Sequence, residues 1–378
     1  MGRVKFNSAY LTGEETAFLG QVFDRKQFYG AGEFSKRCEA QIAKILEVER
    51  VLLTDSCTSA LEISALLLRD RDESQSVIIP SYTFTSTAAA FVRAGFRVIF
   101  CECDPSDMMI DVADAANRVE DDTVAIVGVH YGGLSADIVE LQNLCSEKEL
   151  ILVEDAAQGF ASKYDGRPLG SFGDLGCFSF HETKNLHCGL GGALVVNNPI
   201  FYERSRHILE RGTNRQEVLK GVVDKYTWVE VGGSFYPTEL QAAFLLAQLG
   251  SWQQNLQERN EIASTYHKRL APLVDQGRFK LPLGRSLNQS NFHAVYLIFP
   301  SVDDCDGLRG FLSAKGVDAY IGYVPLHSSP VGLSLGNRPE SLPVTELFAP
   351  RVLRLPLHNG MQSSDAFDVC KLIEEYFS

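Results

Sequence analysis

The sequence predicts an α/β protein with a seven-stranded, mostly parallel β-sheet and a smaller α+β region at the C-terminal end. Two observations predict this class. Short apolar runs alternate with stretches of helical spacing in the first half of the chain. After Gly233 the residue pattern changes, and a long helical pattern begins. The 378 residues, 45% of them hydrophobic, suffice for two cores. We therefore expect a large domain over residues 1–245 and a small domain over residues 246–378.

Seven apolar runs are the predicted strands of the large domain. The first five alternate with helical patterns such as SALEISALLLR, which is typical of crossover units in a parallel sheet covered on both faces. Only the eleven residues 181–191 join the last two runs, too few for an ordinary helical crossover. The runs occupy residues 51–54, 76–80, 97–103, 124–131, 150–157, 177–180 and 192–198.

A long amphipathic pattern leads from the large domain to the small one. Thr238 is followed three residues later by Gln241, which is the spacing of a capping box at a helix start. The spacing predicts one long helix that continues to Leu270. Beyond it, the runs at 292–299 and 319–326 predict strands of the smaller domain.

Composition excludes several classes of function. The net charge of −13, with no cluster of Lys and Arg, argues against a nucleic-acid partner, because phosphate contacts need grouped cations. The sequence has no apolar run of about eighteen residues and its first residues lack the apolar core of a signal peptide, so we expect a cytoplasmic protein without membrane contact. Nine cysteines without a CxxC pair predict reduced thiols and no metal site.

Hydroxyl and aromatic residues follow the first two predicted strands, at the sheet edge where ligands of open α/β sheets collect. Ser56, Thr58 and Ser59 begin a helix whose free N–H groups suit a phosphate, and they also fit ordinary N-caps. Tyr82 and Phe84 follow the second strand. Each of these two rings fits a stacking position or a place in the core.

Carboxylates end the fifth strand, and a lysine follows the sixth. Glu154 and Asp155 come directly after LILV, and strand alternation sends them to opposite sides, so only one need face a ligand. A carboxylate at this place is costly unless it meets a cation. Ser179 lies near the end of the sixth run, and Lys184 follows in the turn. A lysine for a Schiff base, an acid for a ring nitrogen, a phosphate-binding turn and a stacking ring at Phe84 together describe a pyridoxal phosphate site.

Motifs along almost the whole chain resemble the DegT/DnrJ/EryC1/StrS family of sugar-nucleotide aminotransferases. They are PSYTFTSTA, VEDAAQG, GCFSFHETKN and ELQAAFLLAQL. SFHETKN, ERGTNR, VDKYTW, VPLH and LRLPL resemble the subgroup that makes dTDP-4-amino-4,6-dideoxygalactose. The resemblance implies pyridoxal 5′-phosphate as cofactor, the type I aminotransferase fold and a homodimer with shared active sites.

The resemblance also implies roles for single residues. Lys184 would hold the cofactor as a Schiff base, Asp155 would partner its pyridine nitrogen, and Gln158 would lie near its ring hydroxyl. The remaining cofactor contacts that it implies are stacking by Phe84 and phosphate binding by Thr58, Ser59 and Ser179.

One departure concerns a contact across the dimer. Relatives often bind the phosphate with an asparagine of the second subunit, in a Gly-x-Asn-Tyr segment. Here the segment reads GGSFYPTELQ, so Ser234 either makes this contact with a shorter hydroxyl or the contact is lost.

Four further residues are candidates for the sugar nucleotide: Arg211, Asn214 and Arg215 in ERGTNRQ, and His327 in VPLH. A guanidinium fork matches phosphate oxygens. A solvated basic turn and a structural histidine are the alternative interpretations.

The implied reaction moves an amino group from L-glutamate to the C4 ketone of a dTDP-4-keto-6-deoxyhexose, for surface polysaccharides such as O-antigen, with the galacto or gluco outcome open. A C3-ketosugar aminotransferase is the alternative within the family. An NAD-dependent sugar-nucleotide oxidoreductase would need a glycine-rich turn where this chain reads DSCTSA. Dehydratases of this fold carry histidine in place of Lys184, and a non-catalytic sensor would not need Asp155 and Lys184 together.

Overall fold

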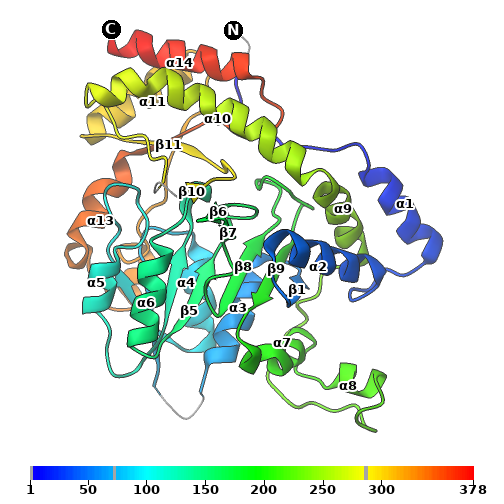
Figure 1. Ribbon diagram of the computed structural model, residues 1–378. Helices are drawn as coiled ribbons and strands as arrows, with labels where there is room; N and C mark the ends of the chain where they lie inside the picture. The colour runs from blue at the N-terminus through cyan, green and yellow to red at the C-terminus, as the bar shows by residue number, and fades with distance from the viewer. Residues whose placement is uncertain (1–2, 71–73, 285–287) are drawn as a thin grey trace.

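The computed structural model describes residues 3–70, 74–284 and 288–378. At its centre lies a seven-stranded sheet in the order β1-β9-β8-β5-β4-β2-β3 (Figure 1). β9 runs antiparallel to both neighbours, and the other adjacent pairs are parallel. The strands are β1 (Val51–Thr54), β2 (Ser76–Pro80), β3 (Arg97–Cys101), β4 (Thr123–Val129), β5 (Ile151–Asp155), β8 (Leu175–Ser179) and β9 (Gly192–Val196). All seven predicted strands are confirmed.

Both faces of this sheet are covered, which explains why each of its strands carries an apolar run. Val77 and Ile79 of β2 belong to a core that includes α3 (Cys57–Leu68) and α4 (Thr85–Ala94). Ile78, between them, belongs to a second core that includes α6 (Ile138–Glu147). The period of two along a strand therefore distributes one apolar run between two cores.

The helical pattern after Thr238 forms two helices, α9 (Glu239–Gly250) and α10 (Trp252–Asp275). The capping box of Thr238 and Gln241 is present as predicted. The single long helix was wrong, because the backbone leaves helical geometry at Ser251, with φ −110° and ψ 15°. Gly250, directly before the break, gives a helix little intrinsic support.

The C-terminal region builds its own antiparallel sheet from β11 (Val295–Ile298), β13 (Val352–Leu355) and β12 (Tyr320–Ile321). The predicted strand segments are present there in shorter form. α10 packs with α14 (Ser363–Phe377) on this sheet, beside α11 (Val302–Ala314) (Figure 1). Val4 joins the same core from the N-terminal end of the chain. The predicted division between residues 245 and 246 falls within α9 and stays a prediction.

Of the remaining elements, α2 (Glu33–Leu46) packs against the face of β1 and β9. Figure 1 shows α8 (Arg215–Leu219) and the loop after it projecting from the body of the molecule. No helix in the described ranges has both the length and the apolar character needed to cross a membrane. The other elements are α1 (Glu15–Arg25), α5 (Val112–Asn117), α7 (Tyr202–Leu209), α12 (Pro330–Ser334), α13 (Pro343–Phe348), β6 (Lys163–Tyr164), β7 (Arg167–Pro168), β10 (Asn288–Gln289) and the 3₁₀ turns η1 (Tyr131–Gly133), η2 (Pro199–Phe201), η3 (Pro339–Ser341) and η4 (Ala349–Arg351).

Candidate active site

A cavity of about 460 Å³ lies at the carboxyl ends of the parallel strands. Its walls come from the segments that follow β1, β2, β4, β5 and β8, and from the C-terminal region. This is the edge where an open α/β sheet binds ligands. The residues that line it include Thr58, Phe84, Ser86, Asp155, Gln158, Ser179, Lys184, His293, Tyr323 and Arg354.

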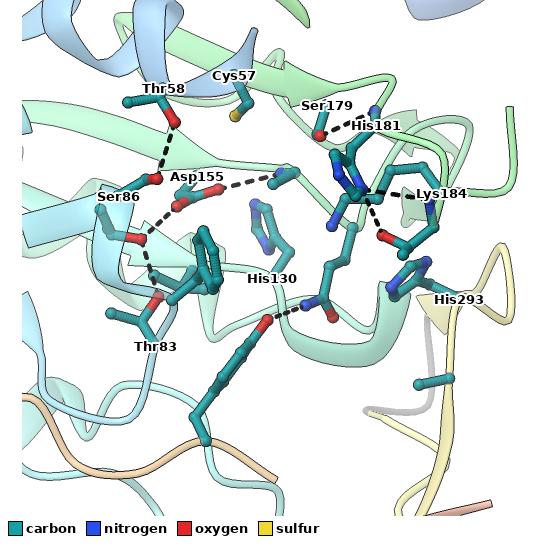
Figure 2. A pocket seen from close by; sticks show the side chains of 18 of the residues that line it. Cys57, Thr58, Thr83, Ser86, His130, Asp155, Ser179, His181, Lys184 and His293 are labelled. Atoms are coloured by element: carbon teal, nitrogen blue, oxygen red, sulfur yellow. Dashed lines mark hydrogen bonds between the residues drawn. The ribbon is translucent and has the colours of Figure 1, made fainter. Parts of the chain in front are cut away.

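One end of the cavity is rich in hydroxyls and helix N–H groups. Ser56 caps α3, accepting the N–H of Ser59 at 3.1 Å. The Thr58 hydroxyl donates to Ser86 Oγ at 2.8 Å (Figure 2). Gly192 lets β9 approach this turn, because a Cβ there would lie 2.3 Å from the Ser56 carbonyl carbon. A helix start with convergent hydroxyls is a donor set suited to a phosphate.

The three residues predicted for the phosphate do not all reach the cavity. Thr58 and Ser179 line it, whereas Ser59 lies behind the wall and donates its hydroxyl to Asp55. Ser86, in the first turn of α4, is a wall hydroxyl that sequence reasoning missed. The run of hydroxyls in TFTST was its only signal.

Asp155 and Glu154 face opposite sides of the sheet, as strand alternation predicts. Asp155 lines the cavity and accepts hydrogen bonds from the Thr87 hydroxyl at 2.7 Å and the Ala157 N–H at 3.1 Å (Figure 2). Glu154 is fully buried on the far side and accepts from the backbone N–H groups of Gly170, Phe172 and Gly173. Asp155 is thus the carboxylate available to a ligand.

His130 is held by two hydrogen bonds that fix its tautomer. Its Nδ1 accepts the Ala136 N–H at 3.2 Å, so the ring proton resides on Nε2, which donates to Glu154 at 2.9 Å. Both ring nitrogens are therefore occupied. His130 contributes a surface to the cavity and leaves no nitrogen for proton transfer there.

Lys184 lies in the turn between β8 and β9 and lines the cavity together with Asp155. Its backbone N–H donates to the backbone carbonyl of His181 at 2.8 Å, and this bond closes the turn. Burial lowers the pKa of the Lys184 ammonium below its usual value, and the charge of Arg354 lowers this pKa further, against opposing effects of Cys57 and Asp155. A larger fraction of Lys184 is therefore free amine than for a solvated lysine.

Phe84 and Gln158 are also part of the cavity wall. The Phe84 ring is 56% exposed, and its centroid lies 6.2 Å from that of Tyr323. Gln158 accepts the Gly132 N–H at 2.7 Å and donates to the Tyr323 hydroxyl at 2.7 Å. These two bonds fix the orientation of the Gln158 amide.

The C-terminal region supplies three wall residues that sequence reasoning missed: His293, Tyr323 and Arg354. They come from three separate segments, more than a hundred residues beyond Lys184 in the chain. Burial and the nearby charge of Lys184 lower the pKa of His293 well below its usual range, so this imidazole is neutral. LRLPL, which contains Arg354, was the only one of these segments with a motif.

The segment after α7 lies apart from this chain's own cavity, and its residues do not line it. Ser234 is exposed and pairs through its backbone with Glu210. Arg211 donates to the Tyr29 hydroxyl at 3.1 Å, and Arg215 pairs with Glu210 at 3.3 Å.

Asn214 is engaged within the same loop: it donates to the Lys225 carbonyl at 3.0 Å and accepts the Thr227 N–H at 2.8 Å. Neither Asn214 nor its neighbours reach the cavity of their own chain. The substrate roles of Arg211, Asn214 and Arg215, and the cofactor role of Ser234, stay predictions.

His327 is also outside the cavity. It is fully buried, its Nδ1 is 2.7 Å from the Ser81 hydroxyl, and its Nε2 is 3.3 Å from the Pro339 carbonyl. These contacts are those of a structural histidine, so the geometry favours the alternative interpretation of VPLH.

The donor set fits pyridoxal 5′-phosphate. Hydroxyls and a helix start suit its phosphate, Asp155 suits its ring nitrogen, Phe84 offers a ring face, and Lys184 offers an amine of lowered pKa. A seven-stranded sheet with one antiparallel strand and this site at its carboxyl edge defines a pyridoxal phosphate-dependent enzyme of the aminotransferase fold.

The chain belongs to the DegT/DnrJ/EryC1/StrS aminotransferase family, which it matches over residues 10–374. Enzymes of this family are pyridoxal phosphate-dependent aminotransferases. The chain is therefore an aminotransferase of sugar nucleotides, as the resemblance implied.

Three curated relatives match nearly the whole chain. GDP-perosamine synthase of Vibrio cholerae is 27% identical and covers 97% of each chain. dTDP-4-dehydro-2,3,6-trideoxy-D-glucose 4-aminotransferase of Saccharopolyspora spinosa is 27% identical, covering 99% of this chain and 98% of the relative. dTDP-3-amino-3,4,6-trideoxy-alpha-D-glucose transaminase of Streptomyces venezuelae is 30% identical, covering 97% and 93%.

The solved structure of the aminotransferase TlmJ from Streptoalloteichus hindustanus confirms the fold. It superposes with a TM-score of 0.90 at 29% identity, covering 100% of this chain and 99% of TlmJ.

Proposed function

We propose that the chain transfers the amino group of L-glutamate to C4 of a dTDP-4-keto-6-deoxyhexose. The product is a dTDP-4-amino-4,6-dideoxyhexose of galacto or gluco configuration, for surface polysaccharides such as O-antigen. The observation that carries the amino-transfer chemistry is the pair Lys184 and Asp155 on one cavity. The C4 position is supported by the motif resemblance and by the relative named as a dTDP-sugar 4-aminotransferase.

The role of each cavity residue in this reaction follows from its position. Lys184 Nζ takes the proton from the nitrogen-bearing carbon of the amino donor in the first half-reaction and delivers a proton to C4 of the sugar in the second, and its lowered pKa keeps more of this amine unprotonated. Asp155 presents an anionic oxygen, oriented by Thr87, for a protonated ring nitrogen. Gln158, fixed by Tyr323, positions a ring substituent. When bound, pyridoxal phosphate supplies the carbonyl that accepts nitrogen and the ring that delocalises charge.

A homodimer is part of this proposal. The loop that follows α8 presents large apolar side chains to solvent, and Trp228 is 73% exposed there. Exposed apolar groups that gather in one segment mark interaction surfaces. Because Arg211 and Ser234 lie in the adjoining segment and outside their own cavity, we assign them to the cavity of the second subunit. The other exposed apolar residues of the loop are Val222, Val223, Tyr226 and Val229, and Leu219 at the end of α8 is exposed beside them.

The C3-ketosugar alternative keeps one supporting observation, the relative named as a dTDP-3-amino-sugar transaminase at 30% identity. A direct assay separates the two positions. In three parallel reactions, the purified protein and L-glutamate are incubated with a dTDP-4-keto, a dTDP-3-keto or a GDP-4-keto 6-deoxyhexose. The amino sugars that form are identified by NMR. We expect the dTDP sugar aminated at C4 as the fastest product. Faster turnover of either other sugar contradicts the proposal.

A further inference from the structure

His293, which lies two residues before β11, has one polar atom left for a ligand. Its backbone N–H donates to Asn291 Oδ1 at 2.9 Å, and its backbone carbonyl accepts from Arg259 at 2.9 Å. Its Nδ1 lies 3.1 Å from Asn185 Oδ1. The ring lines the cavity, and in the described part of the chain its Nε2 meets no hydrogen-bond partner.

The tautomer of this imidazole follows from its neighbour. Asn185 donates its NH₂ group to the backbone carbonyl of Asn291 at 2.8 Å, so its Oδ1 is the atom that meets His293. An amide oxygen only accepts, so the ring proton resides on Nδ1, and Nε2 carries a lone pair. Burial and the charge of Lys184 keep the pKa of His293 well below its usual range, so the ring is neutral. Nε2 is therefore a hydrogen-bond acceptor on the cavity wall.

This acceptor lies at the reacting end of the cavity. Asn185, which contacts the ring, follows Lys184 directly in the chain. Figure 2 shows Lys184 and His293 on the side of the view opposite Thr58, whose end of the cavity carries the hydroxyls suited to a phosphate. A group bound at Nε2 is thus close to the carbon that gains or loses nitrogen at Lys184.

An acceptor at this place selects a ligand group that donates a hydrogen bond without bringing a charge. Phosphate and carboxylate oxygens accept, so they do not fit a lone pair. An ammonium would meet the cationic groups Lys184, Arg259 and Arg354, whose charges all act on this ring. A sugar hydroxyl donates and is neutral. In a 4-keto-6-deoxyhexose, C5 carries the methyl group, so the hydroxyl next to the reacting C4 is the one on C3.

We propose that Nε2 of His293 accepts a hydrogen bond from the C3 hydroxyl of the keto sugar. This inference rests on the proposed function, since it names the contact by which the same site recognises its sugar. It makes His293 a specificity-determining residue for the sugar half of the reaction. The amino donor does not need this contact, because its carboxylates offer no proton to a lone pair.

The test compares the two half-reactions of the holoenzyme, each followed by cofactor absorbance. H293F keeps a ring and removes the acceptor. Its aminated-cofactor form should bind the dTDP-4-keto-6-deoxyhexose roughly 5- to 150-fold more weakly than wild type, as expected for a donor left without its acceptor. The half-reaction with L-glutamate should keep its rate and its apparent affinity. H293Q, whose amide oxygen can replace Nε2 as acceptor, should recover part of the sugar affinity.

A sugar without the hydroxyl identifies the contact. Wild type should bind a dTDP-4-keto-3,6-dideoxyhexose more weakly than the parent sugar, whereas H293F should bind the two sugars alike. H267F is the matched control, because His267 of α10 does not line the cavity and its ring centroid lies 6.4 Å from that of Phe292, directly before His293. This control should leave both half-reactions unchanged.

Equal sugar affinity in H293F and wild type overturns the inference and assigns Nε2 to water. Undiminished discrimination against the 3-deoxy sugar in H293F also overturns it, since another group then recognises the hydroxyl. Loss of both half-reactions in H293F and H293Q alike indicates a structural role and overturns it too. If wild type aminates only the 3-keto sugar, the proposed function is wrong and the C3 assignment falls with it, whereas the other outcomes leave amino transfer to C4 intact.

Discussion

Glu154 and Asp155 are neighbours in sequence, yet their carboxylates have different surroundings and so different expected functions. Glu154 accepts three backbone N–H groups and the His130 ring on the far side of the sheet. Among the residues that the structure describes, the Asp155 carboxylate accepts from the Thr87 hydroxyl and one N–H, and it faces the cavity. Substituting each by its amide should therefore give opposite results.

For Asp155→Asn we expect the fold to persist and turnover to fall by orders of magnitude, because an amide cannot hold a ring nitrogen protonated. Glu154→Gln should instead lower the free energy of unfolding by about 1–3 kcal/mol, since its NH₂ faces N–H donors. The measurements are steady-state rates with the keto sugar and denaturant unfolding of both variants. A fall in rate of less than about tenfold in Asp155→Asn, roughly 1.4 kcal/mol, would show that the wrong carboxylate has been named.

Lys184 is the other residue on which the chemistry depends. Lys184→Ala should abolish turnover, because no other described amine lines the cavity, while the variant keeps its fold. Lys163, which pairs with Glu47 at the surface, offers the matched control Lys163→Ala, expected to be fully active. The readout is the glutamate half-reaction, followed by cofactor absorbance. Activity of Lys184→Ala above a few per cent of wild type contradicts the assignment.

Part of the site was predictable because strand ends in a parallel sheet converge. Thr58, Phe84, Asp155 and Lys184 each follow a recognisable apolar run, so their meeting needed only the fold class. Arg354 could not be found in this way. It lies within a strand of another sheet, and its approach to Lys184 depends on how the C-terminal region packs, which no local pattern encodes.

At the scale of elements, apolar runs predicted the seven strands of the large sheet to within two residues at each end, whereas the runs at 292–299 and 319–326 exceed β11 and β12 by up to five residues. The strand order was not predictable, because the sequence of a strand that is buried on both faces does not show which strands lie next to it. The break between α9 and α10 was missed for a related reason. The spacing of apolar residues continues across Ser251, and the change of direction is decided by packing.

Glu239, at the start of α9, connects two helices and gives a prediction at this scale. Its buried carboxylate accepts the N–H groups of Gly32, Phe34 and Ser35, and so caps α2 from another element. It thus attaches α2 to α9. A cap of this kind joins residues about two hundred positions apart in sequence.

Glu239→Ala leaves those N–H groups without an acceptor, so we expect the free energy of unfolding to fall by about 2–4 kcal/mol. Protease cleavage should then begin near α1 and α2. The exposed Glu147 of α6 offers the control Glu147→Ala, whose surface pair with Lys148 contributes little. Equal stability of the two variants would contradict this account.

At the scale of the whole molecule, the cavity and the projecting loop are two features of the single chain that bear on dimerisation. The cavity collects its ligand groups from one chain, yet Ser234 and Arg211, which the resemblance links to ligands, lie outside it. The apolar loop with Trp228 is exposed to water in the single chain. A second copy of the chain would satisfy both, by covering the loop and receiving Ser234 at its cofactor phosphate.

If so, dimerisation and cofactor retention are coupled, and dilution below the dimer dissociation constant should release pyridoxal phosphate as the chains separate. Ser234→Ala removes one hydroxyl donor to the phosphate, so cofactor binding should weaken by only about 1–3 kcal/mol. Cofactor affinity comes from fluorescence titration and association from sedimentation, with Ser313→Ala on α11 as control. A monomer that binds cofactor at full affinity refutes the coupling. Unchanged affinity in Ser234→Ala shows instead that this serine does not contact the phosphate, whatever the state of association.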